Sequence, residues 1–231
     1  MKRIDILEIL DGKWEDGTRP KDLFSEHIAK APAHYVDALL AGLGSDNRKV
    51  QSGCSELCSL VSEAHPALFA DHIELFQKNL SAKEPILRWE AACTLGNLAV
   101  VDAKELIPQN VDTLIGYLHD KSIVLQLHCV RALVKIADRY PKLAPRIGKA
   151  LLQSTEKFPG NRIGFIVEAM GAFTGIPELL PQIVALINEH AQSDIGSVKT
   201  KARKVQKNLP NATDKPTKKK PGKGREEGVT R

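Results

Sequence analysis

Apolar residues recur along this chain at the spacing of one face of an α-helix. In the clearest segment they occupy positions i, i+4, i+8 and i+11, a periodicity that predicts a helix with one buried face. The segment and its copies are Leu87, Ala91, Leu95 and Leu98; Val50, Cys54, Cys58 and Val61; Leu125, Cys129, Leu133 and Ile136; a looser copy with Ile163, Ile166, Val167, Met170 and Phe173; and a mostly charged copy with Val198, Ala202, Val205 and Leu209. Successive copies are about 36 to 38 residues apart, within the range of two-helix repeats.

A second set of amphipathic helices is predicted between these stripes, over residues 35–43, 68–80, 111–118, 147–152 and 179–187. Prolines and polar turns separate the segments, and proline is tolerated in the first turn of a helix but not inside one. No alternating strand pattern of useful length is present. Because one amphipathic helix pair cannot bury its own apolar face, successive pairs are expected to stack and share one core. The pattern therefore predicts an all-α protein.

The segment 87–99 resembles the second helix of a HEAT repeat. It matches that family's pattern at Leu87, Arg88, Ala91, Ala92, Thr94, Leu95, Gly96, Leu98 and Ala99. The next unit, with Asp120 in its turn, is a fair match, and the similarity covers roughly residues 33–190. The resemblance implies a short right-handed α-solenoid of about four to five antiparallel helix pairs. It also implies that Arg88 pairs with a turn acid of a neighbouring unit.

Three regions follow from these patterns. Residues 1–32 are predicted to be a divergent N-terminal cap with an apolar stripe of Ile6, Leu7 and Leu10, followed by a loop over 12–20. Residues 33–209 are predicted to form the HEAT-like solenoid. Residues 210–231 are rich in Lys, Pro and Gly without apolar periodicity, and are predicted to be a disordered tail.

Charge divides the chain in the same way. Residues 199–231 contain twelve Lys or Arg and three acids, whereas residues 1–198 contain 21 bases and 25 acids. A mildly acidic body is a poor candidate for gripping duplex DNA, because that affinity comes chiefly from neutralising phosphates.

The search for catalytic motifs favours a non-catalytic protein without a metal or cofactor. The sequence has no H-E-x-x-H motif, no phosphate-binding glycine loop and no G-x-S-x-G elbow. Seven histidines are scattered along the chain, and surface or capping roles are expected for them. The four cysteines are expected to pack as free thiols on helical stripes. A lyase activity like that of the bilin lyases, which have related repeats, stays open as an alternative, because no short motif distinguishes them.

A protein-binding surface is predicted on the second helices, which line the concave face of such solenoids. Positions opposite the core stripe form the candidate site: Trp89, Asn97, Leu127, Arg131 and Lys135. Tryptophan and arginine are frequent energetic anchors of interfaces. The sequence therefore predicts an adaptor or scaffold that docks a helix or an extended peptide carrying an acidic residue. The alternative for Trp89 is packing against a neighbouring repeat.

The basic tail suggests a second binding function. Nucleic acid, an acidic partner or anionic lipid are its candidate ligands, with contacts from Lys218, Lys219, Lys220, Lys223 and Arg225. The alternative is a tail that only improves solubility. No apolar run approaches the roughly 18 to 20 residues of a membrane span, and the N-terminus lacks a secretory pattern, so a cytoplasmic protein is expected, or a nuclear one in a eukaryote.

Overall fold

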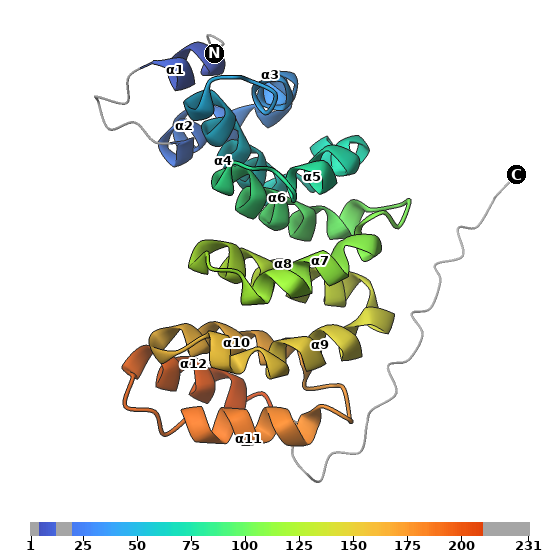
Figure 1. Ribbon diagram of the computed structural model, residues 1–231, viewed down its shortest axis with the longest axis vertical. Helices are drawn as coiled ribbons and strands as arrows, with labels where there is room; N and C mark the ends of the chain where they lie inside the picture. The colour runs from blue at the N-terminus through green and yellow to red at the C-terminus, as the bar shows by residue number, and fades with distance from the viewer. Residues whose placement is uncertain (1–4, 13–19, 210–231) are drawn as a thin grey trace, which may run out of the picture.

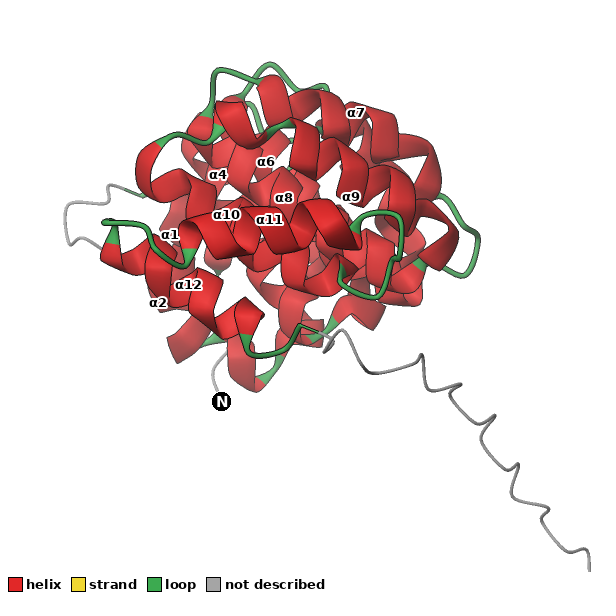
Figure 2. Ribbon diagram, turned by 90° about the horizontal axis from the view of Figure 1, so that it is seen from below, coloured by secondary structure: helices red, strands yellow, loops and turns green. Residues whose placement is uncertain are grey.

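The computed structural model describes residues 5–12 and 20–209 of the chain. These residues form helices joined by short turns, and Figure 2 shows no strand among them. The predicted all-α class is therefore confirmed for the described part of the chain. No helix in these two ranges is both long and apolar enough to cross a membrane.

Within the described ranges there are twelve α-helices, which are arranged in layers from the N-terminal helices at the top of Figure 1 to α11 at the bottom. Their bounds are α1 Ile6–Asp11, α2 Pro20–Glu26, α3 Val36–Gly42, α4 Arg48–Ala64, α5 Ile73–Asn79, α6 Pro85–Leu98, α7 Val111–Gly116, α8 Ile123–Arg139, α9 Ala144–Gln153, α10 Ile163–Met170, α11 Leu180–His190 and α12 Gly196–Gln206. Short 3-10 helices precede or extend many of them: η2 Ile28–Lys30, η3 Pro32–Tyr35, η4 Pro66–His72, η5 Ala99–Val101, η6 Ile107–Asn110, η7 Tyr117–His119, η8 Pro141–Leu143, η9 Thr155–Lys157, η10 Gly160–Arg162 and η11 Gly171–Phe173.

The helices that carry the apolar stripes pack against one another in order, α4 on α6, α6 on α8, α8 on α10 and α10 on α12. Each also packs against the helix that precedes it in the chain, such as α5 on α6 and α7 on α8. The predicted alternation of two helix sets is thus present. Several helices of the second set are preceded by a 3-10 turn that begins with proline, such as η4 before α5. Proline favours such a start because its ring fixes φ at a helical value and it has no backbone N–H to donate.

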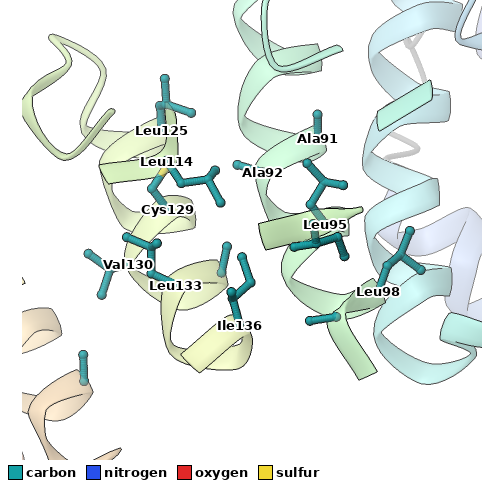
Figure 3. Packing of buried hydrophobic residues seen from close by; sticks show 14 of the residues in the cluster. Ala91, Ala92, Leu95, Leu98, Leu114, Leu125, Cys129, Val130, Leu133 and Ile136 are labelled. Carbon is teal, nitrogen blue, oxygen red and sulfur yellow. The ribbon is translucent and has the colours of Figure 1, made fainter. Parts of the chain in front are cut away.

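The predicted apolar stripes form the core. Every residue of the five stripes that recur between positions 50 and 209 is buried except Leu209, which is partly buried. Figure 3 shows Cys129, Leu133 and Ile136 of α8 on the side that faces α6, with Val130 on the opposite side of α8. Burial of apolar side chains stabilises a fold by about 25 cal/mol per Å². The buried residues from α1 to α12 belong to one contiguous cluster, so one continuous core runs through the layers.

Buried and half-buried polar groups join residues that lie 37 and 38 positions apart, close to the spacing of the apolar stripes. The Tyr117 hydroxyl donates to the Leu80 carbonyl oxygen at 2.6 Å, across 37 residues of sequence. The Tyr140 hydroxyl donates to Oδ2 of Asp102 at 2.7 Å, across 38 residues. The Asp102 carboxyl also accepts from the backbone N–H groups of Leu106 and Ile107, at 3.0 and 2.7 Å. Asp102 thereby fixes the loop after α6 against the end of α8.

Arg88 does not do what the HEAT resemblance implies. It forms no ion pair with any residue in 5–12 or 20–209, and its Nε is buried without a hydrogen-bond partner. Arg48 instead makes the ion pair with Glu84 of the following unit. Arg48 is the first residue of α4 and Glu84 directly precedes α6, so this pair joins the N-terminal ends of the two helices.

The predictions for the two ends of the chain agree with the structure only in part. Ile6 and Leu10 of α1 are buried against α4, and Leu7 is partly buried, as the stripe predicts. The helix α2, which packs on α4, was not predicted. Most of the loop predicted over 12–20, and the tail predicted over 210–231 with Lys218, Lys219, Lys220, Lys223 and Arg225, lie outside the described residues.

Candidate functional site

A groove with a volume of about 430 Å³ lies between α8 and α10, with α12 beside it. Val130, Val134, Phe165 and Ala169 give it an apolar floor. Val130 and Ala169 are buried, whereas Val134 and Phe165 are half-buried and so still present surface to solvent. Two depressions of similar volume, about 450 and 440 Å³, lie beside α2 and α4 and beside η9 and α11, but neither contains a residue that the sequence predicted for binding.

The rim of the groove is positively charged. Arg131, Lys135 and Lys201 line it together with the carboxylate of Glu168, and Lys135 also forms an ion pair of 3.6 Å with Glu63. The Lys201 ammonium is 2.8 Å from Oε2 of Glu168 and 4.2 Å from the centre of the Phe165 ring. The Arg131 guanidinium carbon is 5.9 Å from the same ring centre. An aromatic ring between two cations gives an apolar contact surface in a positive field.

The groove opens here because the small residues that let α6 approach α8 are missing from the next joint. A Cβ atom added to Gly96 would lie 2.6 Å from the Cα of Ala132, so these two helices touch backbone to backbone. The corresponding positions, 38 residues further on, are Val134 and Met170. Two larger side chains cannot approach as closely, and α10 packs on α8 less extensively than α6 does. Val134 is left facing the groove.

The five residues predicted for partner binding do not form one site. Arg131 and Lys135 are exposed and line the groove, as expected. Trp89 and Leu127 are half-buried, pack against the core and do not line the groove. For Trp89 this agrees in part with the alternative prediction that its side chain packs against neighbouring helices.

Asn97 was predicted to contact a partner, but it is buried in the structure. Its side chain is buried because α6 is packed between α4 and α8. Its Nδ2 donates to the Ser59 carbonyl oxygen at 3.1 Å and to the Ser62 hydroxyl at 2.9 Å. Its Oδ1 accepts from Lys135 Nζ at 2.5 Å. Asn97 thus orients the Lys135 side chain through this hydrogen bond, and its own side chain is not available to contact a partner.

Sequence reasoning missed Phe165 and Lys201. Phe165 lies one helical turn before Glu168 on α10, so the two side chains share one side of that helix. Its signal was an aromatic side chain in a chain with only 5% aromatic residues. Lys201 lies on α12, which the charged pattern assigned to the polar end of the array.

A second cluster of functional groups lies between α6 and α8. One ligand atom each of Glu90, Cys93 and His128 lies within 4.8 Å of the other two. Glu90 is buried, and Cys93 and His128 are half-buried. The Glu90 carboxyl accepts a hydrogen bond of 2.5 Å from Ser59, and His128 Nδ1 is buried without a hydrogen-bond partner.

Burial controls the protonation of this cluster. Desolvation raises the pKa of the Glu90 carboxyl to about 7, and the nearby Glu56 charge adds to the shift against the Ser59 hydrogen bond. Desolvation, followed by the charge of Glu90, raises the pKa of the Cys93 thiol to about 11. Desolvation, followed by the charge of Arg131, lowers the pKa of His128 to about 4. At neutral pH the imidazole of His128 is therefore uncharged.

All four cysteines are free thiols, as predicted, but only three of them are fully packed in the core. Cys54, Cys58 and Cys129 are free, buried thiols, and burial raises the pKa of each one. Cys93 is only half-buried and faces His128 across the α6–α8 joint. The sequence placed His128 among scattered histidines because the two residues are 35 positions apart and meet only through helix packing.

Comparisons with known proteins support the fold alone. No protein-family model matches the sequence, and no curated protein matches it either. The structure is similar to two engineered proteins solved by crystallography for the Northeast Structural Genomics Consortium. Target OR366 has 17% sequence identity and a TM-score of 0.63, and the match covers 90% of this chain and 99% of that one. Target OR329 has 18% identity and a TM-score of 0.58, with 90% and 97% covered.

Proposed function

We propose that this protein is a HEAT-type α-solenoid that acts as a non-catalytic adaptor by binding an acidic peptide segment of another protein in the groove between α8 and α10. The groove itself is the observation that supports the proposal. It combines a half-buried aromatic ring and an apolar floor with three cations against two carboxylates, because Lys201 pairs with Glu168 and Lys135 with Glu63. Charge complementarity therefore favours an acidic occupant.

The size and shape of the groove favour a peptide over a large flat surface. A volume of about 430 Å³ holds one or two apolar side chains, while the flanking cations meet acidic groups on the same segment. A helix places such groups at i and i+3 or i+4, and an extended segment places them at i and i+2. Both peptide conformations fit this arrangement.

The repeat architecture within this proposal is supported by the spacing of the contacts between units. Hydrogen bonds and ion pairs join residues 36, 37 and 38 positions apart, as in Arg48 with Glu84, Tyr117 with Leu80 and Lys135 with Asn97. Contacts between equivalent positions of adjacent units are the signature of stacked repeats. The groove is then one interruption in an otherwise regular stack.

Selection from a displayed library of short peptides against the full chain tests the binding proposal. The expected winners carry Leu, Ile or Phe flanked by Asp or Glu. Changing Arg131 and Lys201 together to Glu reverses two rim charges and is expected to weaken these peptides at least about tenfold, which corresponds to about 1.4 kcal/mol. Fluorescence anisotropy with labelled peptides measures the change, and raising the salt concentration is expected to weaken binding to the unchanged chain.

The matched control is Lys142→Glu, which changes an exposed lysine on η8 outside the groove. It is expected to leave peptide binding unchanged. A chain that lacks residues 210–231 separates the groove from the basic tail and is expected to bind the same peptides. The proposal would be contradicted if the selected peptides carried no acidic residues, or if the variant with both Arg131 and Lys201 changed to Glu bound them as tightly as the unchanged chain.

A further inference from the structure

Glu90, Cys93 and His128 bring three different metal-ligating groups to one point of the fold. Glu90 and Cys93 lie three residues apart on α6, so they share one side of that helix. His128 comes from α8, which packs directly on α6. The three ligand atoms are mutually within 4.8 Å. A tetrahedral zinc ion, with bonds of about 2.0 to 2.3 Å, places its ligands roughly 3.4 to 3.6 Å apart, so small side-chain rotations close the site.

The surroundings favour a ligand over a purely structural role. A histidine nitrogen that is buried without a partner costs free energy, and His128 Nδ1 is in that state. The full burial that accounts for Cys54, Cys58 and Cys129 does not extend to Cys93, which is only half-buried. Partial exposure of Cys93 and His128 also gives an ion a path from solvent.

A supporting residue lies behind the carboxyl group. The Ser59 hydroxyl of α4 donates a hydrogen bond of 2.5 Å to Oε2 of Glu90. Metal-ligating side chains are commonly held in orientation by such a second hydrogen bond, whose loss weakens metal binding by about 10- to 100-fold. Ser59 is thus a positioning residue for the site.

We propose that Glu90, Cys93 and His128 bind one divalent transition-metal ion of the zinc class, with an oxygen, a sulfur and a nitrogen ligand. This donor set suits zinc and the metals that substitute for it, because a thiolate and an imidazole discriminate against magnesium and calcium. Three protein ligands leave the fourth tetrahedral position to water. The ion joins α6 to α8 and so stabilises the array between two units. This site shares no residue with the groove, although the charges of Arg131 and Lys135 act on it, and its proposal does not rest on peptide binding.

Cobalt(II) is the probe that tests this site, because its absorption reports its ligands. The full chain is first treated with a chelator and kept reduced with a non-coordinating phosphine. Addition of Co²⁺ is expected to give one ion per chain, visible bands of a four-coordinate ion and a thiolate-to-cobalt charge-transfer band. Zn²⁺ is expected to displace it. Co²⁺ is also expected to quench Trp89, which neighbours Glu90, and a Trp14→Phe background leaves Trp89 as the sole tryptophan.

Variants assign each ligand. Cys93→Ser is expected to abolish the charge-transfer band, His128→Gln and Glu90→Gln to weaken Co²⁺ binding at least about tenfold, and Ser59→Ala to weaken it about tenfold. The controls are His119→Gln, an exposed histidine, and Cys129→Ala, a buried thiol next to His128 in sequence. Both are expected to keep the spectrum, and circular dichroism confirms that each variant is folded.

Thermal unfolding supplies a second measurement that does not depend on cobalt. Zn²⁺ at a concentration about one hundred times its Kd is expected to raise the Tm by roughly 5 to 10 °C, and the Cys93→Ser variant is expected to lose this rise. The proposal is overturned if the unchanged chain gives no charge-transfer band at 1:1 Co²⁺, if the band survives in Cys93→Ser, or if size-exclusion chromatography shows that the ion only bridges two chains.

Discussion

Replacing Asp102 with alanine is expected to lower the free energy of unfolding by about 3 to 5 kcal/mol. The Asp102 side chain is fully buried and accepts from three groups: the Leu106 and Ile107 backbone N–H groups and the Tyr140 hydroxyl. Alanine offers none of them an acceptor, and each buried polar group left without one costs about 1 to 3 kcal/mol. Urea unfolding at constant m-value measures the loss.

Tyr140→Phe shows how much of this effect belongs to the contact between units. Burial, with the hydrogen bond to Asp102 as a second cause, raises the pKa of the Tyr140 hydroxyl, so it remains a protonated donor. Its removal is expected to cost about 1 to 2 kcal/mol, and less than that once Asp102 is already alanine, because the two residues share one hydrogen bond.

Asp138→Ala on the exposed side of α8 is the control and is expected to change stability by less than about 0.5 kcal/mol. A cost below about 1 kcal/mol for Asp102→Ala would show that water or a rearranged loop satisfies the three donors.

Gly96→Ala is expected to destabilise the protein by about 1 to 3 kcal/mol, although alanine is the better helix former. The added Cβ would lie 2.6 Å from the Cα and 2.9 Å from the Cβ of Ala132, so α6 and α8 must move apart. Ala132→Gly is expected to rescue the variant only in part, because the Cα of residue 132 stays in place. Chemical denaturation of the two single variants and the double variant measures these differences.

Gly116→Ala is the matched comparison, because the same substitution there meets no atom within 4 Å. Gly116 is the exposed last residue of α7 and has a helical φ of −56°. Alanine is expected to stabilise the protein at this position by about 0.5 to 1 kcal/mol. Equal effects at the two glycines would show that the α6–α8 contact does not depend on Gly96.

The close contact between Gly96 and Ala132 also bears on why the candidate groove exists. If Gly96 and Ala132 set the close approach of α6 and α8, the larger Val134 and Met170 explain why α10 is held further from α8. Val134→Gly is then expected to narrow the groove and weaken selected peptides, whereas Gly96→Ala acts on the neighbouring joint. Peptide binding by both variants separates the two joints.

The helices and their buried faces follow from the sequence alone. A stripe such as Leu87, Ala91 and Leu95 reports its own burial, because the helical period brings its members to one side without reference to any other part of the chain. The repeat spacing likewise predicted which segments alternate. The exposure of Arg131 and Lys135 was predictable for the same reason. Long charged side chains on the side of a helix opposite its core stripe are seldom buried.

What lies between helices was decided only by the tertiary structure. Asn97 and Arg131 occupy equivalent faces of α6 and α8, yet Asn97 is buried because α6 has close neighbours on both sides, whereas α8 faces the groove. The meeting of Cys93 with His128, and of Phe165 with Lys201, depends on the distance and rotation between two helices. Periodicity fixes the direction of a side chain on its own helix, but the separation of neighbouring helices is set by the summed volumes of side chains that are distant in sequence.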